Sequence, residues 1–145
     1  MPGNISDERT IGNLIARYAF LVDDGDFAGL GELFTYGQLA LNNSDRAIGG
    51  EAVEALLKKM LQTYEDGTPC TRHVSSNIII EIDASGEAAS SRSYSTTFQA
   101  VEGLPLQAIA CGRYDDRFER RDARWVFTYR HIVTGLAGDL SRHRR

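Results

Sequence analysis

The pattern of the sequence changes at Cys70-Thr-Arg-His-Val-Ser-Ser-Asn-Ile-Ile-Ile-Glu-Ile-Asp83. Before this stretch, apolar residues recur every three or four positions, which is typical of helices. From this stretch onward they alternate with polar residues, which is typical of strands. In this stretch, four apolar residues occupy even-numbered positions and therefore share one face of a strand. We predict that this face packs against the core: Val74, Ile78, Ile80 and Ile82. Helices followed by strands indicate an α+β fold.

Three helices are expected before this change of pattern. Ser6 is a capping residue followed by two acidic residues, and the apolar stripe behind it ends at Gly25. Asp26 can cap a short helix over residues 27–34. A second apolar stripe over residues 53–64, with Gly-Gly before it, predicts the third helix.

Four strands are expected after the helices, over residues 74–83, 87–101, 106–119 and 124–134. Their connections are short and rich in turn-forming residues, as in an antiparallel meander. The stretch 36–46 leaves room for one further strand. We therefore expect a cone-shaped, curved antiparallel sheet whose inner face packs on the helices and leaves a central pocket.

The length of the chain fits one domain. A chain of 145 residues is large enough to bury roughly 68–70% of its unfolded surface around one core. We expect a single domain over residues 1–145, with its core at about 6–134 and a flexible tail over 135–145.

Composition argues against several classes of partner. The net charge of −4 makes nucleic acid an unexpected partner, because phosphate binding needs an electropositive surface. No apolar run approaches the ~18 residues of a membrane span, and the N-terminus lacks the apolar segment of a secretory signal, so we expect a cytoplasmic protein without membrane association. Cysteines and histidines lack metal-ligand spacing and no Gly-rich phosphate loop follows a strand, so we expect no metal and no cofactor.

Asp23 and His73 form the candidate base of an active site. An imidazole with a pKa near ~6.5 is a useful base when a carboxylate fixes its tautomer. At about 100° per residue, helical phase places Asp23 at the edge of the apolar stripe and Asp24 on the wet side. The phenol of Tyr18, inside the stripe, can donate a hydrogen bond to a leaving or developing oxygen. This trio predicts proton abstraction or elimination.

Each of the three residues also has a purely structural interpretation. Asp23 can accept hydrogen bonds from the backbone or from Arg17 at the end of a helix. Tyr18 can be a core tyrosine, and His73 can be an exposed or structural histidine.

Further residues are candidates for substrate binding. Asn77 has the parity of His73, so it can orient a substrate or simply bridge strands. Tyr94 and Trp125 are candidates for an aromatic platform, although aromatic residues in such strands more often belong to the core.

Arg130 and His131 compete for one more place in the pocket. Arg130 has the parity opposite to that of Trp125 and His131, so only one of the two sets can face inward. We favour Arg130, and His131 replaces it if the aromatic residues face inward.

Several motifs follow one another in a characteristic order: Arg17-Tyr-Ala19, Val22-Asp-Asp-Gly-Asp26, Leu33-Phe-Thr35, Gly49-Gly50, Arg72-His73, Asn77, Gly112-Arg-Tyr-Asp-Asp116, Arg124-Trp-Val-Phe127 and Arg130. Together they resemble the SnoaL-like branch of the nuclear transport factor 2-like (NTF2-like) superfamily, over roughly residues 6–134. The resemblance implies a cystatin-like α+β barrel. It is less specific for function, because the superfamily includes dehydratases, isomerases, polyketide cyclases and non-catalytic binding modules.

Within that superfamily, Tyr18, Asp23 and His73 are similar to the sites of scytalone dehydratase, bile acid 7α-dehydratase and lindane dehydrochlorinase. The resemblance implies a proton removed by an Asp-supported His before water or chloride leaves, with Arg130 lining the pocket. Two features depart from the family. The dehydratases would have a polar residue on the middle strand of the sheet, and this chain offers only Ser93, Ser95 or Thr96 as its counterpart. A ketosteroid isomerase would need an acidic base near residues 39–42, and this chain has none there.

We therefore interpret the chain as a small cofactor-free lyase or isomerase that acts on a hydrophobic cyclic substrate, such as a steroid, a polyketide or an aromatic catabolite. The alternative is a non-catalytic ligand-binding or assembly module on the same fold. A homo-oligomer is expected by analogy, a dimer first and a trimer as the alternative.

Overall fold

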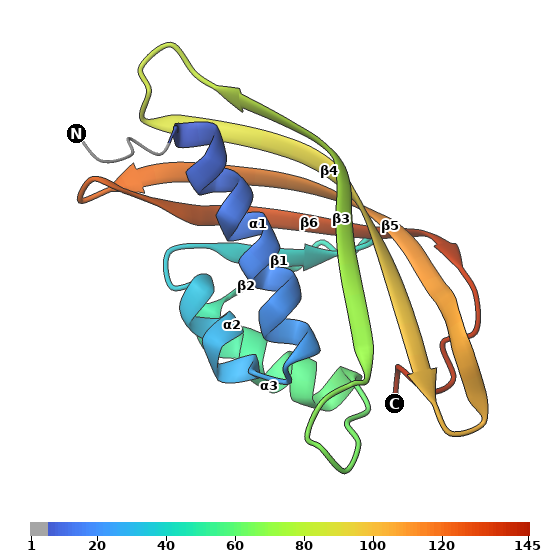
Figure 1. Ribbon diagram of the computed structural model, residues 1–145. Helices are drawn as coiled ribbons and strands as arrows, with labels where there is room; N and C mark the ends of the chain where they lie inside the picture. Colours follow the sequence, from blue (N-terminus) through green and yellow to red (C-terminus); the bar gives the residue numbers. More distant parts are fainter. Residues whose placement is uncertain (1–5) are drawn as a thin grey trace.

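The computed structural model describes residues 6–145, in which three helices pack inside a curved, unclosed sheet of six strands (Figure 1). Residues 1–5 of the expected single domain lie outside the described residues. The elements follow in the order α1 (Asp7–Asp23), α2 (Phe27–Leu33), β1 (Gln38–Leu41), β2 (Ile48–Gly49), α3 (Gly50–Met60), β3 (Thr71–Ile82), β4 (Ala88–Val101), β5 (Leu104–Arg121) and β6 (Arg124–Ala137). The predicted α+β class is confirmed.

The helices begin at the predicted caps. The Ser6 side chain accepts a hydrogen bond from the Arg9 N–H at 3.2 Å, and the Asp26 side chain accepts one from the Gly29 N–H at 2.8 Å. The apolar stripe of α1 lies against the inner face of the sheet, which curves around this helix (Figure 1). Its buried side chains anchor the core: Ile11, Ile15, Tyr18 and Val22.

Strands β3 to β6 form the predicted antiparallel meander, but the whole sheet is not antiparallel. The strand order is β2-β1-β6-β5-β4-β3, and β1 runs parallel to β6. A parallel pair needs a long crossover, and here α3 together with the meander lies between β1 and β6 in the chain. The short strand β2 was not predicted.

A bulge in β3 overturns part of the predicted burial. The pairing with β4 shifts between Ser76 and Ile79, and Asn77 adopts a positive φ of 55° there. The extra residue exchanges the two faces of the strand. Val74 and Ile78 are therefore 47% and 41% exposed, and their predicted core positions are wrong. Beyond the bulge the prediction holds, because Ile80 and Ile82 pack against the core.

A second bulge lies in β6. Tyr129 pairs with Arg117 and Phe127 pairs with Phe118, so Thr128 is the extra residue between the two pairs. Trp125, Phe127 and Arg130 are consequently all buried. The prediction that only one parity of this strand can face inward is wrong, because the bulge changes the parity.

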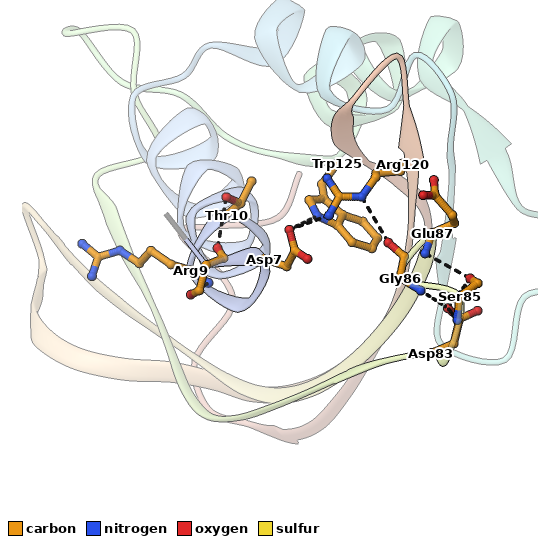
Figure 2. A network of polar contacts seen from close by, with 10 residues as sticks. Asp7, Arg9, Thr10, Asp83, Ser85, Gly86, Glu87, Arg120 and Trp125 are labelled. Atoms are coloured by element: carbon orange, nitrogen blue, oxygen red, sulfur yellow. Dashed lines mark hydrogen bonds and ion pairs between the residues drawn. The ribbon is translucent and has the colours of Figure 1, made fainter. Parts of the chain in front are cut away.

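The start of α1 is tied to the sheet by Asp7 (Figure 2). Its carboxylate accepts hydrogen bonds from the Arg120 guanidinium at 2.6 Å and from Trp125 Nε1 at 3.1 Å. The guanidinium also lies 4.8 Å from the centre of the Trp125 ring, and its Nε donates to the Gly86 carbonyl in the β3–β4 turn. The Trp125 hydrogen bond, followed by that of Arg120, holds the pKa of Asp7 below its ordinary value.

The tail that the sequence predicts to be flexible makes hydrogen bonds with the rest of the domain. Residues 138–145, here called the C-terminal segment, fold back toward α3 and β4, and the chain ends beside these elements (Figure 1). The Gln62 N–H donates to the His143 carbonyl at 2.8 Å, and Gln99 Nε2 donates to the Arg142 carbonyl at 2.9 Å. These hydrogen bonds join residues that lie far apart in the sequence, so local sequence patterns do not reveal them.

Candidate active site

A cavity of about 150 Å³ lies between α1, α3, the inner face of the sheet and the C-terminal segment. Apolar side chains form part of its lining, among them Val22, Leu57 and Ile132. The lining also contains residues with hydrogen-bonding side chains: Tyr18, Asn42, His73, Ser95, Thr97, Tyr114, Thr134, His143 and Arg144. An apolar cavity with a few polar groups is typical of a small-molecule site, and this one is smaller than the common range of ~300–1,000 Å³.

Asp23 and His73 meet at the wall of this cavity. His73 Nδ1 lies 2.6 Å from Asp23 Oδ1, and the His73 backbone N–H donates to Asp23 Oδ2 at 2.8 Å. The Thr71 hydroxyl donates to Asp23 Oδ1 at 2.7 Å. The last residue of α1 is thereby joined to the start of β3. Asp24, by contrast, is exposed, as helical phase predicts.

The contacts define the tautomer of His73. Burial alone would raise the pKa of Asp23, but hydrogen bonds from His73 and Thr71 hold this pKa below its ordinary value. Asp23 is therefore an ionised acceptor at neutral pH, and the proton between the two groups belongs to His73 Nδ1. In the neutral ring, Nε2 is then the nitrogen that carries the lone pair, as a general base requires.

Tyr18 lies in the same wall and is buried at 5% exposure. Its ring packs edge-to-face on Phe34 and on Tyr114, with ring centres 6.1 Å and 5.9 Å apart. Burial raises the pKa of Tyr18 above its ordinary value. Its side chain therefore stays a neutral phenol at neutral pH, a group that can donate a hydrogen bond.

Arg130 faces inward but is not part of the cavity lining. Its side chain is fully buried, and Nε and Nη2 donate to the two carboxylate oxygens of Asp116 at 2.8 Å each. The guanidinium lies 3.8 Å from the ring centre of Tyr114 and 4.4 Å from that of Tyr18. The structure thus places Arg130 behind the two tyrosines, where it supports the wall of the site. The predicted place of Arg130 in the pocket lining is wrong.

Four other predicted binding residues lie away from the cavity. Tyr94 is 50% exposed, and Trp125 is a core residue bonded to Asp7. Asn77 is exposed in the β3 bulge, and His131 Nε2 contacts the Asn42 carbonyl at 2.7 Å. The bulges in β3 and β6 explain why Asn77 and His131 do not face the cavity. Tyr94 is instead an exposed residue of β4, and Trp125 belongs to the core. Among the middle-strand candidates, Ser95 lines the cavity.

His143 is a site residue that the sequence did not reveal. It is 8% exposed, lines the cavity, and its ring centre lies 6.3 Å from that of His73. No local motif marks it, because long-range hydrogen bonds of Gln62 and Gln99 hold its segment in place. Tyr114, part of the Gly112-Arg-Tyr-Asp-Asp116 motif, also lines the cavity.

Two features are absent from the described part of the chain. Residues 6–145 contain no group of three or more His, Cys, Asp or Glu side chains placed to hold a metal ion. Within the same residues, none of the helices has both the length and the apolar character needed to cross a membrane.

The sheet is curved and unclosed, it surrounds an N-terminal helix, and the cavity between them carries a few polar side chains. This arrangement defines the NTF2-like class of α+β folds. The SnoaL-like domain model matches residues 3–131. The chain belongs to the SnoaL-like family, and the resemblance inferred from the motifs is confirmed. No curated protein matches the sequence.

Solved structures support the same fold. An NTF2-like protein with a cystatin-like fold from Novosphingobium aromaticivorans is 26% identical, with a TM-score of 0.73 over 94% of this chain and 86% of that chain. A candidate scytalone dehydratase from the same organism is 22% identical, with a TM-score of 0.71 over 92% and 87%. ActVI-ORFA from Streptomyces coelicolor is 16% identical, with a TM-score of 0.70 over 88% and 96%.

Proposed function

We propose that the chain is a small cofactor-free lyase or isomerase in which the Asp23–His73 pair removes a proton from a hydrophobic cyclic substrate. The observation that carries the proposal is the 2.6 Å contact between His73 Nδ1 and Asp23 Oδ1 beside the cavity. A carboxylate that fixes the tautomer of a histidine gives the ring a free lone pair and stabilises the imidazolium that forms.

The reaction begins when His73 Nε2 takes a proton from carbon. The electron pair of the broken C–H bond moves into the substrate, and the phenol of Tyr18 donates a hydrogen bond to the oxygen that becomes negative. In an elimination the leaving group then departs. In an isomerisation the imidazolium returns its proton to another carbon. A positioned general base contributes typically ~10²–10⁴-fold, and the remaining acceleration comes from positioning and fixed hydrogen-bond donors.

The size of the cavity favours the smaller candidates among the predicted substrates. A volume of about 150 Å³ suits a molecule with one or two rings better than a four-ring steroid. One similar structure is named a candidate scytalone dehydratase, which is consistent with a dehydration. We therefore favour a small polyketide or an aromatic catabolite.

Proton abstraction can be measured without the natural substrate. The probe is 2-tetralone, a bicyclic ketone with acidic protons beside its carbonyl group, and its exchange of hydrogen for deuterium in D₂O is followed by proton NMR. We expect Asp23→Asn and His73→Gln to slow the protein-catalysed exchange by about 10²–10⁴-fold. Asp24→Asn is the matched control, because Asp24 is the neighbouring exposed carboxylate, and it should keep the wild-type rate.

Two results would contradict the proposal. One is a wild-type rate no greater than that of the same concentration of free imidazole. The other is a full rate in the Asp23→Asn or His73→Gln variant. A protein that binds 2-tetralone without exchanging its protons would be the non-catalytic binding module instead.

A further inference from the structure

We propose that His143, on the C-terminal segment, completes the site as a neutral hydrogen-bond donor to the substrate oxygen that becomes negative when His73 removes the proton. This inference rests on the proposed function and adds to it a residue from outside the family motifs. It also assigns a substrate class: a cyclic compound with a hydrogen-bond-accepting oxygen, such as a ketone, beside its acidic C–H group.

The position of His143 is fixed by the fold. Its backbone carbonyl accepts the Gln62 N–H at 2.8 Å, and the preceding carbonyl, that of Arg142, accepts from the buried side chain of Gln99 at 2.9 Å. Arg144 forms an antiparallel bridge with Leu61. The segment is thus bonded on both sides of His143, and the imidazole is held in the cavity wall.

Hydrogen bonding distinguishes the two nitrogens of the His143 ring. Nδ1 is buried and has no hydrogen-bond partner within residues 6–145. A buried N–H without an acceptor is more costly than a buried lone pair, so the neutral ring carries its proton on Nε2. Nε2 is also the nitrogen left to reach the cavity that His143 lines. The site therefore contains an N–H donor at this position.

The surroundings keep this ring neutral. Burial lowers the pKa of His143 to about 4, and the electrostatic interactions of His143 with His73 and with Arg144 act in the same direction. The carboxylate of Asp23 acts in the opposite direction but does not outweigh them. At neutral pH, His143 is an uncharged donor, and His73 is left as the base of the pair.

The two histidines are complementary. Nε2 of His73 has a lone pair because Nδ1 donates to Asp23, whereas Nε2 of His143 carries a proton. Their ring centres are 6.3 Å apart, which allows one small molecule to contact both. The substrate proton moves to His73, and its electron pair moves to the carbonyl oxygen as an enolate. His143 donates a hydrogen bond to that oxygen and keeps its own proton.

The experiment compares His143→Phe, which lacks a donor, with His143→Gln, which keeps an N–H, in the 2-tetralone exchange assay. We expect His143→Phe to lower kcat by about 10–100-fold, the loss of one hydrogen bond to a developing charge, with little change in KM. His143→Gln should restore most of the rate. Ser141→Ala, an exposed change in the same segment, should behave as wild type.

The outcomes separate the two proposals. If His73→Gln keeps the wild-type rate, the proposed function fails and the role of His143 fails with it. If His73→Gln is inactive while His143→Phe keeps the wild-type kcat, only the role of His143 is overturned. Nitrogen NMR of the wild-type protein with labelled histidine tests the tautomer independently of folding in the variants. A His143 ring protonated on Nε2 alone at pH 7 supports the proposal, and a proton on Nδ1 contradicts it.

Discussion

Replacement of Arg130 by Met is expected to destabilise the fold rather than to weaken substrate binding directly. Arg130 is fully buried, and two of its nitrogens donate to the two carboxylate oxygens of Asp116 at 2.8 Å. Burial alone would lower the pKa of Arg130, but the adjacent Asp116 raises it above its ordinary value, so the pair is ionic. Met keeps an unbranched side chain in the core but removes the charge that compensates Asp116.

The size of the effect follows from what Asp116 would keep. Its remaining side-chain contact is the Ser91 hydroxyl at 3.4 Å, which is too long to replace two bonds from a guanidinium. Breaking a buried ion pair by removing one partner costs about 3–5 kcal/mol, a large part of a typical stability of about 5–15 kcal/mol. For a chain of this size the melting temperature should fall by about 10 °C.

Urea unfolding followed by circular dichroism measures the effect. A double variant, Arg130→Met with Asp116→Leu, is the control, because removing both charges of a buried pair is often close to neutral. We expect it to recover most of the lost stability. The reasoning is refuted if Arg130→Met stays within about 1 kcal/mol of wild type, or if the double variant is no more stable than the single one. Weaker binding of 2-tetralone at unchanged stability would instead support the sequence prediction of a substrate-binding arginine.

Three other outcomes are expected. Asp7→Ala removes the hydrogen bonds of Arg120 and Trp125, so it should lower the melting temperature in calorimetry but leave 2-tetralone exchange unchanged. The pKa of Asp23 in the folded protein lies below its ordinary value of 3.8. The ionised Asp23 therefore contributes stability at pH values above 3.8, and this contribution is lost as the pH falls through the lower pKa of the folded state. The urea midpoint of the wild-type protein should consequently drop more steeply in acid than that of Asp23→Asn. Tyr94 is 50% exposed beside the exposed Val74 on the outer face of the sheet, so we expect light scattering to give a dimer mass and Tyr94→Lys to give a monomer; a wild-type monomer would contradict this expectation.

Local patterns predicted the elements of the fold well. The apolar stripe of α1 and its cap at Ser6 depend on neighbours within one or two turns, and the structure has both. Helical phase likewise separated buried Asp23 from exposed Asp24, because α1 is regular up to its last residue. These predictions needed only the geometry of one element.

Predictions that depended on strand parity were less successful. Parity counts residues from a known position, and one bulge reverses every position beyond it. Asn77 and Thr128 occupy such bulges, and neither is a glycine or a proline that would mark an irregularity in the sequence. The C-terminal segment was missed for a different reason, because Gln99 and Gln62 lie 43 or more residues in the sequence from Arg142 and His143, the residues of the segment that they bond.

The two bulges have a common consequence for the candidate site. In β3, the bulge lets His73 face the cavity while Ile80 and Ile82, which have the opposite parity, still pack against the core. In β6, it lets Phe127 enter the core while Arg130 reaches Asp116 behind the tyrosines. A regular strand would force a choice between the polar site and the apolar core at each place. Because each irregularity serves both, the bulges are part of how one curved sheet holds a charged dyad beside an apolar pocket.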